Sequence, residues 1–234
     1  MSSPQRTAYR PKEILLGVTG GISAYKSCEL LRRLQDHGFG VTVIPTKASL
    51  NFVGKTTWEA LSAREVIDDL WANSSIVPHV SLSRGCNAIV IAPATADFIA
   101  KMVSGLADDL LSNTILASNS HVIVVPAMHT EMWENEAVQA QLRLLHSRGI
   151  HSVGPEYGEL SCHDTGIGRL CDPALLTCLP QFATLPRLDL AHKKVLITAG
   201  GTSEPLDPVR TITNRSSGKL GEALAHLAAF WGAE

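Results

Sequence analysis

Residues 14–44 read ILLGVTGGISAYKSCELLRRLQDHGFGVTVI and hold a strand, a glycine-containing turn, a helix and a second strand. Residues 14–18 form a continuous apolar run, as expected where helices cover both faces of a parallel sheet. Residues 22–37 carry an apolar stripe at helical spacing, and Gly38 is placed to end this helix. Residues 41–44 begin the next strand. The stretch therefore predicts one strand–helix–strand unit.

The same alternation of apolar runs and helical patterns continues along the chain. The predicted strands are residues 87–91 and 121–125, and the predicted helices are residues 97–104, 108–118 and 131–148. This order predicts an α/β fold, doubly wound and Rossmann-like, around a parallel sheet. Residues 154–172 break the pattern because they hold four glycines and show no periodicity.

The chain divides into two parts. Residues 12–180 are expected to form one domain, and residues 181–192 read as a linker because their polarity is mixed. A second strand–helix unit begins at residue 193, with the predicted strand KKVLI, the turn TAGGTSEP and a helix from about residue 217.

Composition excludes several classes of protein. Of 234 residues, 45% are hydrophobic and 18% charged, which is enough apolar surface for a sizeable core. The net charge is −2 and the pI about 6.5, far below that of typical nucleic-acid-binding domains. No apolar run could span a membrane, the first residues do not resemble a signal peptide, and the five cysteines have neither disulfide-framework nor zinc-site spacing. We expect a cytoplasmic protein without nucleic-acid or membrane partners and without a bound metal.

A glycine turn follows the first strand at residues 19–23, TGGIS. Glycines let backbone N–H groups approach an anion, and the helix N-terminus adds a positive partial charge. The spacing is not that of the dinucleotide fingerprint G-x-G-x-x-G. An equally plain interpretation is a tight turn in which Ser23 caps the following helix.

Two further turns follow the strands at 87–91 and 121–125. They read APATAD (residues 92–97) and PAMHTEMW (residues 126–133). Open α/β sheets bind ligands at the carboxyl ends of their strands, so three such turns at one edge predict a ligand site. The alternative is that Asp97 and Thr130 only cap their helices.

Two further side chains are candidates for chemistry. His79 precedes a helix-like stretch and lies outside any apolar run, where a structural role is the usual alternative. Cys162 lies in the polar, glycine-rich segment GELSCHDTGIGRL, which is typical of a mobile lid rather than of a core. An incidental loop cysteine remains the alternative.

These segments occur together, in one order, with GLADDLLSN and the full forms TGGISAYK, VPHVSL and APATADFIAKM. In this combination residues 12–179 resemble the flavin-containing cysteine decarboxylases, specifically the phosphopantothenoylcysteine decarboxylases. Residues 193–234, with TAGGTSEPLDPVRTITNRSSGKLG, resemble the opening of the phosphopantothenate–cysteine ligases. The order of the two parts is similar to that of bacterial bifunctional coenzyme A biosynthesis flavoproteins.

The resemblance implies FMN as the cofactor. The phosphate of FMN would lie at the glycine turn and at PTKAS, and its ring system would lie against the second and third turns. The positions that the resemblance assigns to FMN are Gly20, Gly21, Ser23, Thr46, Ala48, Thr95, Ala96, Asp97 and Ala127. A neighbouring subunit would close part of the site, because family members are homotrimers or dodecamers built of trimers.

The resemblance also implies a reaction, the decarboxylation of 4′-phospho-N-pantothenoylcysteine to 4′-phosphopantetheine. FMN would oxidise the substrate thiol to a thioaldehyde, CO2 would leave, and the enethiol would be reduced again. His79 matches the family's base and Cys162 the acid that protonates the enethiolate. Because relatives without this cysteine stop at the enethiol, Cys162 favours the complete, redox-neutral reaction.

Substrate-binding positions of the family match His129, Met132, Leu160 and Ser161. The family usually has asparagine at position 129, where its amide helps to hold the substrate carboxylate. An imidazole can still donate one hydrogen bond, and more strongly when protonated. The glycine that usually follows the lid cysteine is His163 here, a change that stiffens the lid and bears on the pKa of the thiol.

In the second part, Gly200, Gly201 and Thr202 fit a nucleotide-phosphate turn, and Asn214 matches a residue involved in resolving the acyl-cytidylate. CTP and Mg belong to a complete ligase domain, so no ligase activity is expected from these residues. Two alternatives to the decarboxylase remain: another flavin-dependent enzyme of this fold, and a non-catalytic FMN-binding regulator. His79 and Cys162 together favour an enzyme.

Overall fold

The computed structural model describes residues 12–71, 77–161, 164–177, 190, 193–230 and 232–233. Cys162 and His163 lie outside the described residues. The chain separates into two compact units, Met1–Thr184 and Leu185–Glu234, which are treated individually below.

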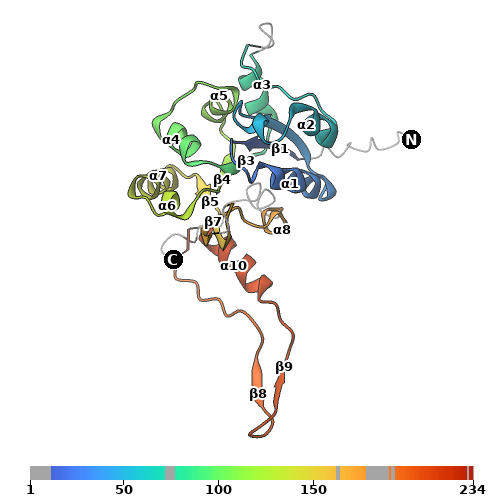
Figure 1. The fold of residues 1–234 in the computed structure, drawn as a ribbon, viewed down its shortest axis with the longest axis vertical. Coiled ribbons are helices and arrows are strands. Elements are labelled where there is room, and N and C mark those ends of the chain that lie inside the picture. Colours follow the sequence, from blue (N-terminus) through green and yellow to red (C-terminus); the bar gives the residue numbers. More distant parts are fainter. Residues whose placement is uncertain are drawn as a thin grey trace, which may run out of the picture. The chain divides into compact units, whose positions relative to one another are not determined.

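A parallel sheet forms the centre of the first unit (Figure 1). Its strands are β1 (Glu13–Val18), β2 (Gly40–Pro45), β3 (Ala88–Ala94), β4 (His121–Pro126) and β5 (His151–Ser152). They are arranged in the order β2-β1-β3-β4-β5, and every neighbouring pair is parallel. The predicted doubly wound α/β fold is therefore confirmed.

Helices connect these strands. They are α1 (Ala24–Asp36), the 3-10 helix η1 (Ser49–Asn51), α2 (Lys55–Ser62), α3 (Pro78–Gly85), α4 (Ala96–Ser104), α5 (Leu110–Leu116), α6 (Thr130–Trp133), α7 (Glu136–Ser147) and α8 (Pro173–Leu176). No helix in the described part of the chain combines the length and apolar character that a membrane span requires.

Side chains alternate across the sheet, so the strands contribute to two cores. Leu15, Ile89 and Val122 are neighbours in the register and pack with α4, α5 and α7. The adjacent residues Leu16 and Val90 point to the opposite face, which is covered by the buried apolar stripe of α1. Figure 1 shows α1 on the other side of the sheet from α4 and α5. Helices on both faces explain why the strands are continuously apolar.

The chain passes from β1 to the edge strand β2 and then returns across β1 to β3. The connection after β1 runs to β2 on one side and the connection after β3 runs to β4 on the other, so the loops that follow β1 and β3 diverge. Such a switch point leaves a crevice at the carboxyl ends of the strands. The turns that begin at Thr19 and Thr95 border this crevice.

The prediction of one continuous helix over residues 131–148 is wrong, because the helix is interrupted near its N-terminal end. The structure has two helices, α6 and α7, separated by a break at Asn135. The Asn135 side chain accepts a hydrogen bond from the Ala137 backbone N–H and so starts a new helix. An asparagine flanked by helix-forming glutamates did not reveal this boundary in the sequence.

Residues 154–172 showed no periodicity, yet they contain an antiparallel hairpin of β6 (Glu156–Glu159) and β7 (Thr165–Arg169). The Met128 backbone N–H donates to the Gly168 carbonyl over 3.0 Å and attaches the hairpin to the loop after β4. A Cβ at Gly168 would overlap the Met128 carbonyl oxygen, and one at Gly166 would overlap Thr130 Oγ1. The glycines that obscured the strand pattern therefore allow this close approach.

In the second unit, the prediction of a strand at KKVLI (residues 193–197) is wrong. Residues 193–199 have no regular structure, and Leu196 is 93% exposed. A strand needs a partner, and the strands described in this unit, β8 (Ser203–Pro205) and β9 (Thr211–Thr213), pair with each other. The predicted helix is present as α10 (Lys219–Phe230).

Candidate functional site

One cavity of about 1140 Å³ opens at the carboxyl edge of the central sheet. Pockets for a single drug-sized ligand usually hold about 300–1000 Å³, so this cavity has room for a cofactor together with a substrate. All the residues predicted to bind FMN or substrate lie in its wall: Gly20, Gly21, Ser23, Thr46, Ala48, Thr95, Ala96, Asp97, Ala127, His129, Met132, Leu160 and Ser161. Their individual roles stay predictions.

The glycine turn presents free donors to the cavity. Within the described residues, the backbone N–H groups of Gly20, Ile22 and Ser23 have no hydrogen-bond acceptor. Ser23 occupies the N-cap position of α1, but its side chain makes no capping hydrogen bond. The alternative interpretation, a turn held by a Ser23 cap, is therefore wrong, and the hydroxyl remains available to a ligand. Free N–H groups at a helix N-terminus are suited to an anion.

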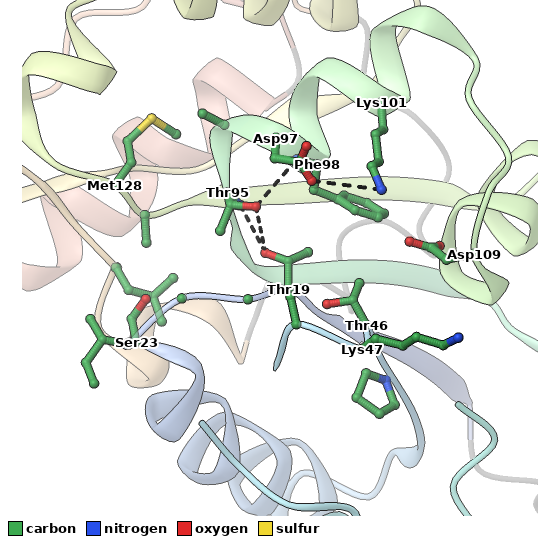
Figure 2. A pocket seen from close by; sticks show the side chains of 18 of the residues that line it. Thr19, Ser23, Thr46, Lys47, Thr95, Asp97, Phe98, Lys101, Asp109 and Met128 are labelled. Atoms are coloured by element: carbon green, nitrogen blue, oxygen red, sulfur yellow. Dashed lines mark hydrogen bonds and ion pairs between the residues drawn. The ribbon is translucent and has the colours of Figure 1, made fainter. Parts of the chain in front are cut away.

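Thr19 joins this turn to the loop that follows β3 (Figure 2). The buried Thr19 hydroxyl donates to the Pro93 carbonyl over 2.7 Å and accepts the Thr95 backbone N–H over 3.0 Å. The Thr95 hydroxyl lies 3.3 Å from that of Thr19. These hydrogen bonds therefore hold the turn after β1 and the loop after β3 in one relative position.

The glycine turn also packs directly against the loop that follows β2. A Cβ at Gly20 would lie 2.5 Å from the Ala48 Cβ, a distance that real side chains do not adopt. Glycine is therefore required at position 20 in this arrangement, and a small residue is required at position 48. This observation agrees with the predicted phosphate site, in which both backbones must approach one ligand.

The loop after β3 leads into α4, whose cap is Thr95 and not Asp97. The Thr95 hydroxyl accepts the Phe98 backbone N–H over 3.4 Å. Lys101 Nζ lies 3.9 Å from Asp97 Oδ2 and 2.9 Å from Asp108 Oδ2. The hydrogen bond that Lys101 donates to Asp108 raises the pKa of Lys101. Lys101 is thus a neutralised cation in the cavity wall.

His129, at the end of the loop after β4, lies between two carboxylates. Its Nδ1 is 2.9 Å from Glu131 Oε2, and its Nε2 is 3.8 Å from Asp164 Oδ2. The hydrogen bond from His129 lowers the pKa of Glu131. His129 is the N-cap residue of α6, so Thr130 is not the cap that the sequence suggested. Glu131 holds the ring so that Nε2 is the nitrogen left for a ligand.

Of the two predicted catalytic residues, His79 lies within the described residues and Cys162 does not. His79 is the second residue of α3 and does not line the cavity. Its Nδ1 is buried and has no hydrogen-bond partner within the described residues. Cys162 falls outside the described residues. In the sequence it directly follows Ser161, which lies in the cavity wall.

Sequence reasoning missed part of the cavity wall. The further lining residues include Thr19, Lys26, Lys47, Asp68, Asp69, Leu70, Trp71, Phe98, Lys101, Asp108, Asp109, Gly168 and Arg169. Thr19 directly precedes the glycines, and Arg169 lies within the segment GELSCHDTGIGRL, so both had a local signal. Residues 68–71 follow α2 rather than a strand, and only the tertiary fold shows that they reach the site.

In the second unit, the residues predicted for the nucleotide turn lie beside Asn214. The Thr202 backbone N–H donates to Asn214 Oδ1 over 3.0 Å, and a Cβ at Gly201 would lie 2.8 Å from the Asn214 carbonyl oxygen. Gly200 has a φ of +103°, which favours glycine. Asn214 thus contacts the turn at Gly201 and Thr202, and the role of these residues in a ligase stays a prediction.

Family models match both parts of the chain. Residues 2–177 match the model of the Flavoprotein family, and residues 190–234 match that of the DNA/pantothenate metabolism flavoprotein C-terminal domain.

Curated relatives carry the name coenzyme A biosynthesis bifunctional protein CoaBC. The protein of Mycobacterium tuberculosis is 47% identical over 229 residues, which cover 96% of this chain and 54% of the relative. The protein of Vibrio cholerae is 45% identical over 225 residues, which cover 95% of this chain and 56% of the relative. The chain thus spans about half the length of these relatives.

Solved structures share the fold of the first unit. A Cys-to-Ser variant of a PPC decarboxylase in complex with pantothenoylaminoethenethiol has a TM-score of 0.68 and 29% identity, covering 74% of this chain and 97% of that one. The FMN-binding protein AtHal3 has a TM-score of 0.65 and 29% identity, covering 74% of this chain and 96% of that one. The chain therefore belongs to the flavoprotein family.

Proposed function

We propose that this chain is an FMN-dependent decarboxylase that converts 4′-phospho-N-pantothenoylcysteine to 4′-phosphopantetheine in coenzyme A biosynthesis. The observation that carries the proposal is the single cavity whose wall contains every predicted FMN and substrate position. The names of the relatives and of the related PPC decarboxylase support the same activity. The domain boundaries of the proposal are residues 12–180 for the decarboxylase, 181–192 for a linker and 193–234 for part of a ligase domain.

The glycine turn fits the phosphate of FMN. Three unpaired backbone N–H groups, the free Ser23 hydroxyl and the N-terminus of α1 all favour a dianion at one place. Thr46 and Ala48 bound the same place from the loop after β2. Thr95, Ala96, Asp97 and Ala127 would lie along the ring system. When bound, FMN supplies a two-electron oxidation of the substrate thiol and returns those electrons later.

His129 would orient the substrate carboxylate. Glu131 occupies Nδ1 and leaves Nε2 for a ligand, and the imidazolium form of His129 would donate from Nε2 to the substrate carboxylate. Met132, Leu160 and Ser161 line the cavity around it and would exclude water from the cysteinyl end. Loss of CO2 then leaves the electron pair on the sulfur-bearing fragment.

Two proton transfers remain, and we assign them to His79 and Cys162. His79 would take the proton of the substrate thiol, and Cys162 would deliver a proton to the carbon that loses CO2. Because His79 is absent from the cavity wall of its own chain, we infer that it reaches the cavity of a neighbouring subunit in a homotrimer or a trimer-based dodecamer. The orphaned Nδ1 supports a role for His79 beyond local packing.

The second unit is proposed to belong to a phosphopantothenate–cysteine ligase domain, in which CTP and Mg are the expected ligands. We assign no ligase activity to these residues by themselves. A cytoplasmic location stays a prediction from the composition.

The test is CO2 release from 4′-phosphopantothenoylcysteine by the purified protein after loading with FMN. The absorbance spectrum should show bound flavin, and CO2 release should depend on it. Bound flavin without CO2 release would favour the non-catalytic regulator instead. Decarboxylation of cysteinyl peptides with no activity on the pantothenoyl compound would favour another cysteine decarboxylase.

A further inference from the structure

Among the cations of the cavity wall, Lys26, Lys47 and Arg169 have no ion-pair partner within the described residues, and two of them, Lys26 and Arg169, act on each other. Lys26 is the third residue of α1 and Arg169 is the last residue of β7, and both line the cavity. Neither has an ion-pair partner within the described residues, in contrast to Lys101, which lies 2.9 Å from Asp108. Lys26 is partly buried whereas Arg169 is exposed, and an unpaired cation that is partly buried is costly, so the position of Lys26 needs an explanation.

The two charges act on each other. Burial lowers the pKa of Lys26, and the positive charge of Arg169 lowers it further. Glu156, Asp172 and Glu29 act in the opposite direction but offset this lowering of the Lys26 pKa only in part. Glu156 Oε1 accepts the Asp172 N–H over 3.0 Å, and Asp172 Oδ1 accepts the Ala174 N–H over 2.8 Å. Both acids keep their charge, but neither forms an ion pair with Lys26 or Arg169 within the described residues.

Arg169 is held in place by the hairpin. Its side chain lies across Gly158 of β6, where a Cβ would be 2.9 Å from Arg169 Cδ and 3.1 Å from Nη1. The preceding residue, Gly168, is bonded through its carbonyl to the Met128 N–H. Arg169 is thus anchored beside the loop after β4, which contains Met128. Lys26 belongs to α1, the helix that begins at the glycine turn.

We propose that Lys26 and Arg169 together bind the phosphate monoester of the substrate, at the end opposite its cysteine. This inference rests on the proposed function, which places two phosphate dianions in one cavity. The glycine turn, with its free N–H groups, accounts for the phosphate of FMN. The second dianion requires its own cations, and an Arg fork beside a Lys point charge is suited to a phosphate.

The test compares two ligands that differ only in this phosphate. Binding of 4′-phosphopantothenoylcysteine and of pantothenoylcysteine to the FMN-loaded protein is measured by calorimetry, and kcat and KM are measured for both. Lys26→Met and Arg169→Met should each weaken binding of the phosphorylated compound by about 10- to 100-fold, the value of one charged hydrogen bond. Binding of pantothenoylcysteine should change less than about twofold, and kcat should stay near that of the wild type.

Arg32→Met is the matched control, since Arg32 is an exposed cation of the same helix outside the cavity wall. It should leave both affinities unchanged. Equal losses for the two ligands would overturn the proposal. The proposal would also be overturned if the variants kept the wild-type ratio of affinities for the two substrates but bound FMN more weakly and riboflavin equally well. The pair would then bind the phosphate of the cofactor. Failure of the wild type to release CO2 would refute the proposed function alone, because the binding comparison still decides the role of the pair.

Discussion

The Thr95 backbone N–H donates to the Thr19 hydroxyl over 3.0 Å, and this bond joins the turn after β1 to the loop after β3. The same hydroxyl donates to the Pro93 carbonyl over 2.7 Å. One buried side chain thus sets the distance between the two loops that diverge at the switch point.

Thr19→Val should weaken FMN binding and lower stability. Valine has the shape of threonine, but it leaves the Thr95 N–H without an acceptor, at a cost of about 1–3 kcal/mol. Thr19→Ser keeps the hydroxyl and should retain FMN. Urea unfolding and titration of the apoprotein with FMN measure the two effects. Equal behaviour of the valine and serine variants would show that the hydroxyl does not position the loops.

Gly20→Ala should separate the glycine turn from the loop after β2. The new methyl group would lie 2.5 Å from the Ala48 Cβ, so one of the two backbones must move. We expect overpacking of about 1–3 kcal/mol, equivalent to a loss of FMN affinity of about tenfold or more. Gly54→Ala is the control, because a Cβ there meets nothing within 4 Å. Undiminished FMN affinity of the Gly20 variant would exclude this turn from the phosphate site.

The Glu131 carboxylate should titrate below its ordinary pKa of 4.5, because His129 donates a hydrogen bond to it. A lowered folded-state pKa contributes stability above the unfolded-state value, and this contribution is lost as the pH falls through the folded-state pKa. The effect on stability is small since Glu131 is exposed. Carboxyl-carbon NMR should show the pKa of Glu131 rising in His129→Ala. An unchanged titration would mean that the pair does not form in solution.

His79 and Cys162 should complement each other between subunits. His79→Asn and Cys162→Ser should each reduce formation of 4′-phosphopantetheine by about 100-fold or more, as for other lost acid–base groups. Assemblies that mix the two variants at random should recover about a quarter of the native activity, since a cyclic oligomer then contains native pairs of neighbours. No recovery in mixed assemblies would place both residues in one subunit.

The sequence predicted the central sheet because its signal is local. Strands such as residues 14–18 are buried on both faces, so every position in them is apolar. The three loops at the carboxyl edge could be predicted for the same reason, since each directly follows such a strand. Thus Gly20, Thr95 and Ala127 were assigned to the cavity wall before the fold was known.

The remainder depended on contacts between distant residues. The hairpin of β6 and β7 was missed because its glycines serve close contacts with Met128 and Thr130 rather than a local pattern. The strand predicted at 193–197 failed because an apolar run forms a strand only when another strand lies beside it. Lys26 ends the quoted segment TGGISAYK, but its interaction with Arg169 exists only in the folded chain.

The central claim is a redox-neutral decarboxylation, and anaerobic turnover tests it most directly. The FMN-loaded protein is mixed with a large excess of 4′-phosphopantothenoylcysteine without oxygen, and CO2, thiol products and flavin absorbance are measured together. We predict many equivalents of CO2 per flavin, 4′-phosphopantetheine as the product and oxidised flavin at the end. One equivalent of CO2 per flavin, with enethiol and reduced flavin accumulating, or no CO2 at all, would contradict the account.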